Sequence, residues 1–74
     1  MILPSKHIPL HKSLLGVGAA LLKRLDRPTT VTVLWERCHE VEEIGSFERF
    51  VKALDLLFAL GIIRFDRGLL VKAE

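Results

Sequence analysis

Cysteine and histidine are the residues of this chain best suited to chemistry, and two pairs of them are close in sequence. Cys38 and His39 are adjacent, and adjacent side chains on a helix point in different directions, so they do not form a nucleophile with its base. His7 and His11 have the i, i+4 spacing of two metal ligands. Pro9 between them breaks that helical geometry, and no carboxylate lies nearby to complete a site. We therefore expect neither a catalytic centre nor a bound metal.

Two other segments have part of the pattern of a ligand site. The Gly-Val-Gly sequence at residues 16–18 lacks the third glycine and the preceding strand of a dinucleotide-binding loop. The acidic residues Glu40, Glu42 and Glu43 are more typical of a solvated loop than of a metal site. Cys38 falls on the apolar side of a predicted helix, which indicates a place in the core. The sequence therefore predicts a protein with no cofactor and no enzymatic activity.

The elements that position these residues can be predicted from the spacing of apolar side chains. Hydrophobic residues make up 50% of the chain, which excludes a disordered protein. The longest apolar stretch, residues 56–63, is far too short to cross a membrane. Apolar residues recur at steps of three and four, which is the period of an amphipathic helix. The predicted helices span residues 10–26, 31–39 and 47–60.

The spacing of apolar residues changes after Gly61. A glycine at this position suits the left-handed conformation that ends many helices. Residues 62–65 and 69–72 are expected to be strands, joined by a three-residue turn over Asp66-Arg67-Gly68. The two strands together are expected to form a C-terminal hairpin that follows the helices. The side chains that can cap the second and third helices are those of Thr29 or Thr30 and of Ser46.

The order helix, helix, helix, hairpin predicts a mainly α fold, a winged helix-turn-helix. Residues 1–9 contain two prolines and are expected to form an extended arm, with the winged-helix domain over residues 10–74. A single cysteine, Cys38, excludes a disulfide-stapled secreted protein. The opening Met-Ile-Leu-Pro lacks the basic start and long apolar run of a signal peptide, so the expected location is the cytoplasm.

Nucleic acid is the partner that most winged helices bind, and the chain has a mild net charge of +2. The third helix is expected to expose a stripe of side chains that begins with two cations and ends with apolar residues. Apolar side chains cannot form the hydrogen bonds that distinguish base edges. Cations on the hairpin can contact phosphates without reading sequence, or they can protect an open strand edge. The outward stripe comprises Arg49, Lys52, Ala53, Leu56 and Leu60, and the nucleic-acid candidates are Arg49, Lys52, Arg64, Arg67 and Lys72.

Apolar residues supply the candidates for a protein contact. Leu56 and Leu60, exposed together, would make an apolar patch that either the chain itself or a partner must cover. Ile2, Leu3 and Ile8 would form a second apolar strip along the arm. These five residues are the predicted protein-binding site, and self-association into a homodimer through the same patch is a further alternative.

Three stretches of the chain resemble a known family. They are LPSKHIPLHKSLLGVGAALL (Leu3 to Leu22), the pair Leu34-Trp35, and FERFVKALDLLFALGI (Phe47 to Ile62). Together they resemble the small middle-component proteins of bacterial three-component ABC-ATPase systems, and among these the group called middle component six. The arm with its SLLGxG continuation is the most specific part, because many winged helices share the shape of the other two stretches.

The resemblance implies a non-catalytic accessory subunit encoded beside a large SMC- or Rad50-like ATPase and an effector. Such systems look like defence modules against phages or plasmids, related to the Lamassu type. The expected partner is therefore that ATPase or a companion subunit of the same operon, with no membrane contact. The alternative from another class is a winged-helix DNA-binding protein or transcriptional regulator, which would contact the phosphate backbone.

Overall fold

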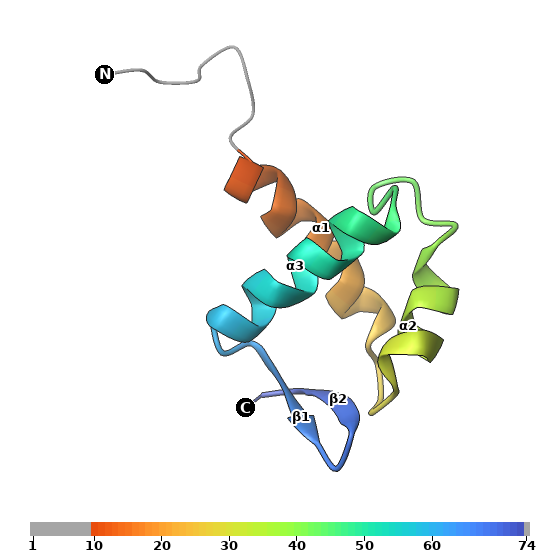
Figure 1. Ribbon diagram of the computed structural model, residues 1–74, viewed down its shortest axis with the longest axis vertical. Coiled ribbons are helices and arrows are strands. Elements are labelled where there is room, and N and C mark those ends of the chain that lie inside the picture. The colour runs from red at the N-terminus through yellow and green to blue at the C-terminus, as the bar shows by residue number, and fades with distance from the viewer. Residues whose placement is uncertain (1–9, 74) are drawn as a thin grey trace.

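The computed structural model describes residues 10–73, and side chains from residue 14 onward. Within these residues the chain forms three helices followed by an antiparallel hairpin, as Figure 1 shows. The predicted mainly helical, winged-helix arrangement is confirmed. The extended arm over residues 1–9 lies outside the described residues and stays a prediction. The elements are α1 (Leu10–Arg24), α2 (Val31–Cys38), α3 (Phe47–Ala59), β1 (Ile63–Asp66) and β2 (Leu69–Lys72).

Side-chain caps fix where α2 and α3 begin. The Thr30 hydroxyl accepts a hydrogen bond from the amide of Val33 at 3.1 Å, so Thr30 rather than Thr29 caps α2. The Ser46 hydroxyl accepts from the amide of Arg49 at 3.2 Å and caps α3, as predicted. Each cap satisfies an amide that has no partner inside its helix. The two caps therefore set the start of both helices of the helix-turn-helix.

A glycine ends α3 and sends the chain into the wing. Gly61 has φ +75°, a conformation that other residues rarely adopt. Its amide donates to the carbonyl of Phe58 at 3.0 Å, and the amide of Ile62 donates to the carbonyl of Leu57 at 2.9 Å. These two bonds form a Schellman motif, which satisfies the last carbonyls of the helix. The predicted stop at Gly61 is confirmed, and it fixes how the hairpin leaves α3.

The turn of the hairpin is tighter than the sequence predicted. Asp66 pairs with Leu69 across the two strands, so only Arg67 and Gly68 form the loop. Both have positive φ, +57° and +82°. This is the geometry of a type I′ turn, whose twist matches that of the flanking strands. The predicted three-residue turn is wrong because Asp66 remains in the ladder as the last residue of β1.

The loop between α1 and α2 also pairs with the wing, which the sequence did not predict. Thr29 and Leu70 exchange two backbone hydrogen bonds, with N···O distances of 2.7 and 3.2 Å. The bridge fastens the α1–α2 loop to β2 and buries both residues, Thr29 to 7% exposure and Leu70 to 0%. The wing is thereby held to the helical body by backbone pairing as well as by side-chain packing.

The core lies where α1 crosses α3, and Figure 1 shows the two helices in contact. Gly18 permits the close approach, because a Cβ there would lie 3.1 Å from Cδ2 of Leu57. Ile44, from the connector between α2 and α3, is also fully buried. The buried hydrophobic residues are Val17, Leu21, Leu25, Leu34, Cys38, Ile44, Phe50, Ala53, Leu54, Leu57, Ile63 and Leu70.

The outward stripe predicted for α3 is wrong at Ala53, which is completely buried. Ala53 lies three residues after Phe50 and four before Leu57, and both of these are buried as well. Side chains at such spacing share one helix face, so Ala53 belongs to the core. The opposite face of α3 carries charged side chains and a small residue, namely Glu48, Lys52, Asp55 and Ala59. In residues 10–73 no helix is long and apolar enough to span a bilayer.

Candidate functional site

Cys38, the residue with the most reactive side chain, is buried in the core. It is 0% exposed, which confirms the core position predicted for it. Burial raises the pKa of the Cys38 thiol, and the positive charges of Arg24 and Arg37 only partly oppose that rise. The thiol is thus kept protonated and out of reach of substrates. Over the described part of the chain, no three His, Cys, Asp or Glu residues come close enough to hold a metal ion.

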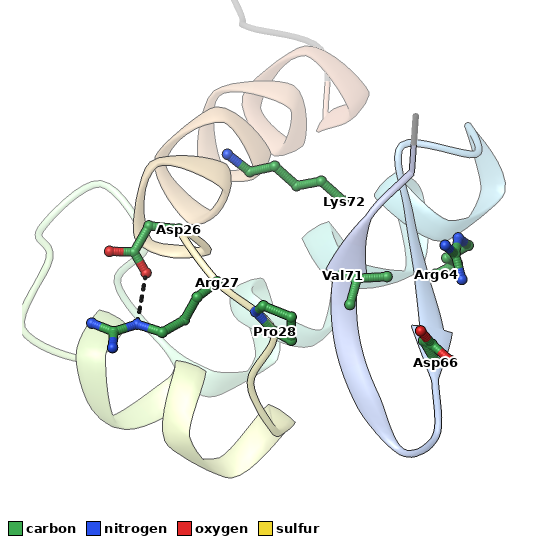
Figure 2. Close-up of a pocket in the computed structure, with 7 residues that line it drawn as sticks. All are labelled: Asp26, Arg27, Pro28, Arg64, Asp66, Val71 and Lys72. Carbon is green, nitrogen blue, oxygen red and sulfur yellow. Dashed lines mark ion pairs between the residues drawn. The ribbon is translucent and has the colours of Figure 1, made fainter.

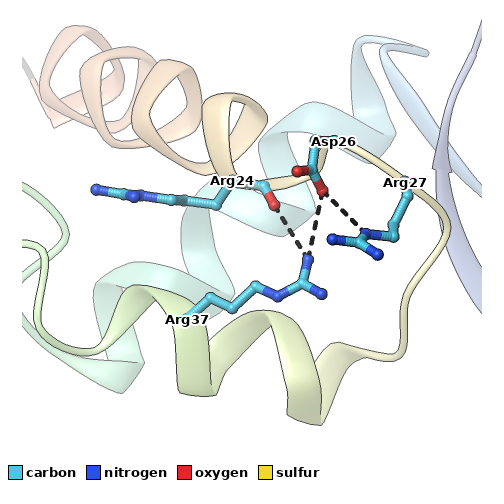
Figure 3. A network of polar contacts seen from close by, with 4 residues as sticks. All are labelled: Arg24, Asp26, Arg27 and Arg37. Carbon is cyan, nitrogen blue, oxygen red and sulfur yellow. Dashed lines mark hydrogen bonds and ion pairs between the residues drawn. The ribbon is translucent and has the colours of Figure 1, made fainter.

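A polar network joins the end of α1 to α2 (Figure 3). Arg37 of α2 donates to the carbonyl oxygen of Arg24 at 3.5 Å and forms an ion pair with Asp26 at 3.5 Å. Arg27 pairs with the same Asp26 oxygen at 3.6 Å. The Asp26 side chain is 64% exposed, and exposed pairs of this kind contribute little stability. The network links the last turn of α1 to α2.

Arg49, the first of the nucleic-acid candidates on α3, is engaged inside the chain. Its guanidinium donates to the carbonyl oxygens of Ile44 at 3.1 Å and of Glu43 at 3.2 Å. These contacts tie the α2–α3 connector to the start of α3. The second candidate, Lys52, pairs with Glu48 one turn earlier at 3.3 Å. Both cations therefore have partners within the protein, and an approaching phosphate would compete with them.

The three wing candidates are exposed, and two of them line a hollow of about 290 Å³ together with Arg27 (Figure 2). The side chain of Lys72 extends from β2 toward α1 in that view. Two carboxylates share the hollow, so its positive charge is partly cancelled. Arg67 lies in the turn, outside the hollow. The lining residues are Asp26, Arg27, Pro28, Arg64, Asp66, Val71 and Lys72.

The predicted protein-binding residues are only partly exposed. Leu60 is 54% exposed at the end of α3, whereas Leu56 is half-buried. The remaining three candidates, Ile2, Leu3 and Ile8, lie outside the described residues. Leu60 is thus exposed as expected, and a protein contact at any of the five residues stays a prediction.

A second apolar surface, which the sequence did not predict, runs along the side of α3 that faces away from Leu60. At its start Phe47 is 52% exposed and packs edge-on against Trp35 of α2, with ring centroids 5.2 Å apart. At its end Phe58 stacks on Phe65 of β1, which is 51% exposed, at 5.1 Å. Val51 lies between the two pairs. We call this surface the aromatic strip: Trp35, Phe47, Val51, Phe58 and Phe65.

The sequence contained a partial signal for the aromatic strip. Phe47, Val51 and Phe58 lie within about 40° of one another around a helix of 100° per residue. Apolar side chains at this spacing are typical of a core face, but the buried face of α3 is centred on Phe50 and Leu57. The strip is therefore the edge of the apolar face, left open where the covering elements end.

Comparison with known proteins identifies the family. The family model of ABC-three component (ABC-3C) system Middle Component 6 matches residues 3–74. Searches of curated proteins and of solved structures each found no match. The match covers the helices, the wing and residues 3–9 before them. The chain therefore belongs to the Middle Component 6 family of ABC-three component systems, and as a middle component it has partner subunits in its system.

Proposed function

We propose that the chain is a non-catalytic accessory subunit that docks on the large ATPase of its system or on a companion subunit from the same operon. The ATPase is of the SMC or Rad50 type, and the system acts in cytoplasmic defence against phages or plasmids, as in Lamassu-like modules. Family membership supports the requirement for partner subunits. The resemblance of the sequence to the middle-component proteins supports the SMC- or Rad50-like nature of the ATPase and the defence role.

The observation that carries the proposal is the amount of exposed apolar side chain on so short a chain. Five large apolar side chains in the described part are 38% exposed or more. Exposed apolar patches on small proteins usually mark contacts with other proteins. The side chains are Leu15, Val33, Phe47, Leu60 and Phe65.

Co-purification tests the proposal. The tagged chain is co-expressed with the ATPase and effector encoded beside it, captured, and washed at rising salt concentration. Because an apolar contact is screened little by salt, we expect at least one companion to remain bound through the washes. Elution of the chain alone, after every companion has been confirmed in the lysate, would contradict the proposal.

The alternative is DNA binding through the wing, which three exposed cations favour. In this case the affinity for duplex DNA falls with salt, with a log–log slope of about −0.9 for each phosphate contacted. A variant with Arg64, Arg67 and Lys72 all changed to alanine should then lose that slope. We expect no binding of duplex DNA by the isolated chain even at low salt, in the wild type or in the variant.

A further inference from the structure

We propose that the aromatic strip is the docking site for one amphipathic helix of a companion component, and that Lys or Arg residues flank the apolar face of that helix. This inference rests on the proposed function and names the surface and the chemistry of the partner. It differs from the surface that the sequence predicted, because Leu60 lies on the far side of the α3 axis from Phe58.

The strip has the construction of a rigid docking surface. Trp35 is packed against both Phe47 and Phe50, at centroid distances of 5.2 and 5.1 Å, so its ring is fixed. Phe65 is held by its stack on Phe58 and by its place in the ladder opposite Leu70. Aromatic side chains that are already ordered lose little entropy when a partner covers them. Such anchors typically dominate the energy of a contact.

The length of the strip matches a short helix. Eleven residues separate Phe47 from Phe58, which corresponds to about 16 Å at a rise of 1.5 Å per residue. A partner helix of about three turns would span the same distance. Laying the apolar face of a helix along a hydrophobic surface is a common mode of peptide recognition.

Charge beside the strip favours cations on the partner. Glu48 and Asp55 lie on the exposed face of α3, next to the strip. Lys52 is the nearest cation on that face and is paired with Glu48 at 3.3 Å. Asp55 forms no ion pair with the side chains that the structure describes, those of residues 14–73. Along α3 the border of the strip therefore has one more carboxylate than cations, and a Lys or Arg on the partner would neutralise that charge.

The same charges disfavour a second copy of this chain. A twofold contact that sets Phe47 against Phe58 of the other copy brings Glu48 within two residues of Asp55 of that copy. Like charges so placed oppose association. Residues 1–9 of the same chain are a poor match for a helical occupant of three turns, because Pro4 and Pro9 would interrupt a helix within that segment.

Site-specific crosslinking is the first test. A photoreactive phenylalanine analogue replaces Phe47, Phe65 or Leu60 in turn, the chain is co-expressed with its companions, and crosslinked peptides are identified by mass spectrometry. We expect positions 47 and 65 to reach one helical segment of a companion, with an apolar stripe bordered by Lys or Arg. Crosslinks from position 60 alone, to a second copy, or to residues 1–9 of the same chain would overturn the inference.

Two substitutions test the energetics with matched controls. Phe47→Asp, at the first position of α3 where an acidic residue suits the helix dipole, should weaken binding of the companion at least tenfold. Ala19→Asp, which introduces the same charge at an exposed site on α1 outside the strip, should not. Asp55→Lys should also weaken binding, whereas Glu42→Lys, an equal charge change on the connector, should leave it unchanged.

The controls separate this inference from the proposed function. Thermal unfolding of each variant checks that it folds, and the exposed Asp55→Lys variant remains usable if Phe47→Asp does not fold. Normal companion binding by both Phe47→Asp and Asp55→Lys would overturn the docking site while the proposed function stands. Failure of the wild-type chain to bind any companion would overturn both.

Discussion

Arg67 adopts a backbone conformation that its side chain disfavours. Its φ of +57° makes it the one non-glycine residue with positive φ among residues 10–73. Asparagine tolerates the left-handed region far better, and Asn-Gly is the preferred pair in a type I′ turn. We expect Arg67→Asn to raise the free energy of unfolding by up to about 1 kcal/mol, whereas Arg67→Val should lower it.

Urea unfolding checks this prediction. The midpoint for Arg67→Asn should move to higher urea with an unchanged slope, because only the folded turn is affected. A lower midpoint for Arg67→Asn than for the wild type would show that the arginine side chain stabilises the turn. The same variant removes one wing cation and should leave companion binding unchanged.

Cys38 makes stability depend on pH. Burial raises the pKa of its thiol, so in the folded state the proton is held to higher pH than in the unfolded chain. The stabilisation is complete below the thiol pKa of the unfolded chain, about 8.5, and is lost as the pH rises through the raised pKa of the folded state. We therefore expect the melting temperature to fall above about pH 8.5, and to fall less in Cys38→Ala.

Melting curves of both proteins between neutral and alkaline pH check this. Other titrating groups are common to both, so the difference between the two curves isolates the thiol. An equally steep fall in Cys38→Ala would contradict the buried position, as would rapid reaction of Cys38 with a thiol reagent under native conditions.

The connector between α2 and α3 depends on Arg49. The guanidinium donates to the carbonyl oxygens of Glu43 and Ile44, which would otherwise lack these partners. We expect Arg49→Ala to lower the free energy of unfolding by about 1 kcal/mol or more. Lys52→Ala removes only an exposed pair with Glu48 and should cost about 0.5 kcal/mol or less.

Chemical denaturation of the two variants compares these costs. Because each variant removes one positive charge from α3, the pair controls for net charge. Equal stability of Arg49→Ala and the wild type would show that the connector does not need this clamp. It would also leave the arginine available for the nucleic-acid contact that the sequence suggested.

Helices and caps could be predicted from sequence because their causes are local. Apolar spacing placed all three helices, and Ser46 and Gly61 marked two of their ends. The predicted boundaries differ from the observed ones by one or two residues, as frayed helix ends usually do. The two features that were not predicted depend on pairing with other parts of the chain. The Thr29 bridge needs Leu70, and the tight turn needs Asp66 to pair with Leu69.

The aromatic strip could not be predicted because it depends on how whole elements meet. Sequence spacing shows that Phe47 and Phe58 are apolar and share one side of α3. Whether that side is covered depends on where α2 ends and on how β1 leaves the helix. The stacking of Phe65 on Phe58 follows from that path and from the strand register, which no local pattern encodes.

The small size of the whole molecule limits how much apolar surface it can bury. A domain of about 60 to 70 residues removes only about 60% of its extended-chain surface from water. This chain keeps Leu60 exposed on one flank of α3 and two phenylalanines exposed along the other. The cations among the described side chains are mostly paired or mixed with carboxylates, as around Asp26. The surface is therefore better suited to an apolar protein contact than to a phosphate backbone.

The heat-capacity change of binding distinguishes an apolar protein contact from a contact with phosphates. Burial of apolar surface on association gives a negative heat-capacity change, whereas phosphate contacts give an affinity that falls steeply with salt. Calorimetric titration of the chain into its purified companion at several temperatures measures the first quantity. We predict a clearly negative heat-capacity change and an affinity that falls only weakly as the salt concentration rises. A value near zero, with an affinity that salt abolishes, would contradict the account.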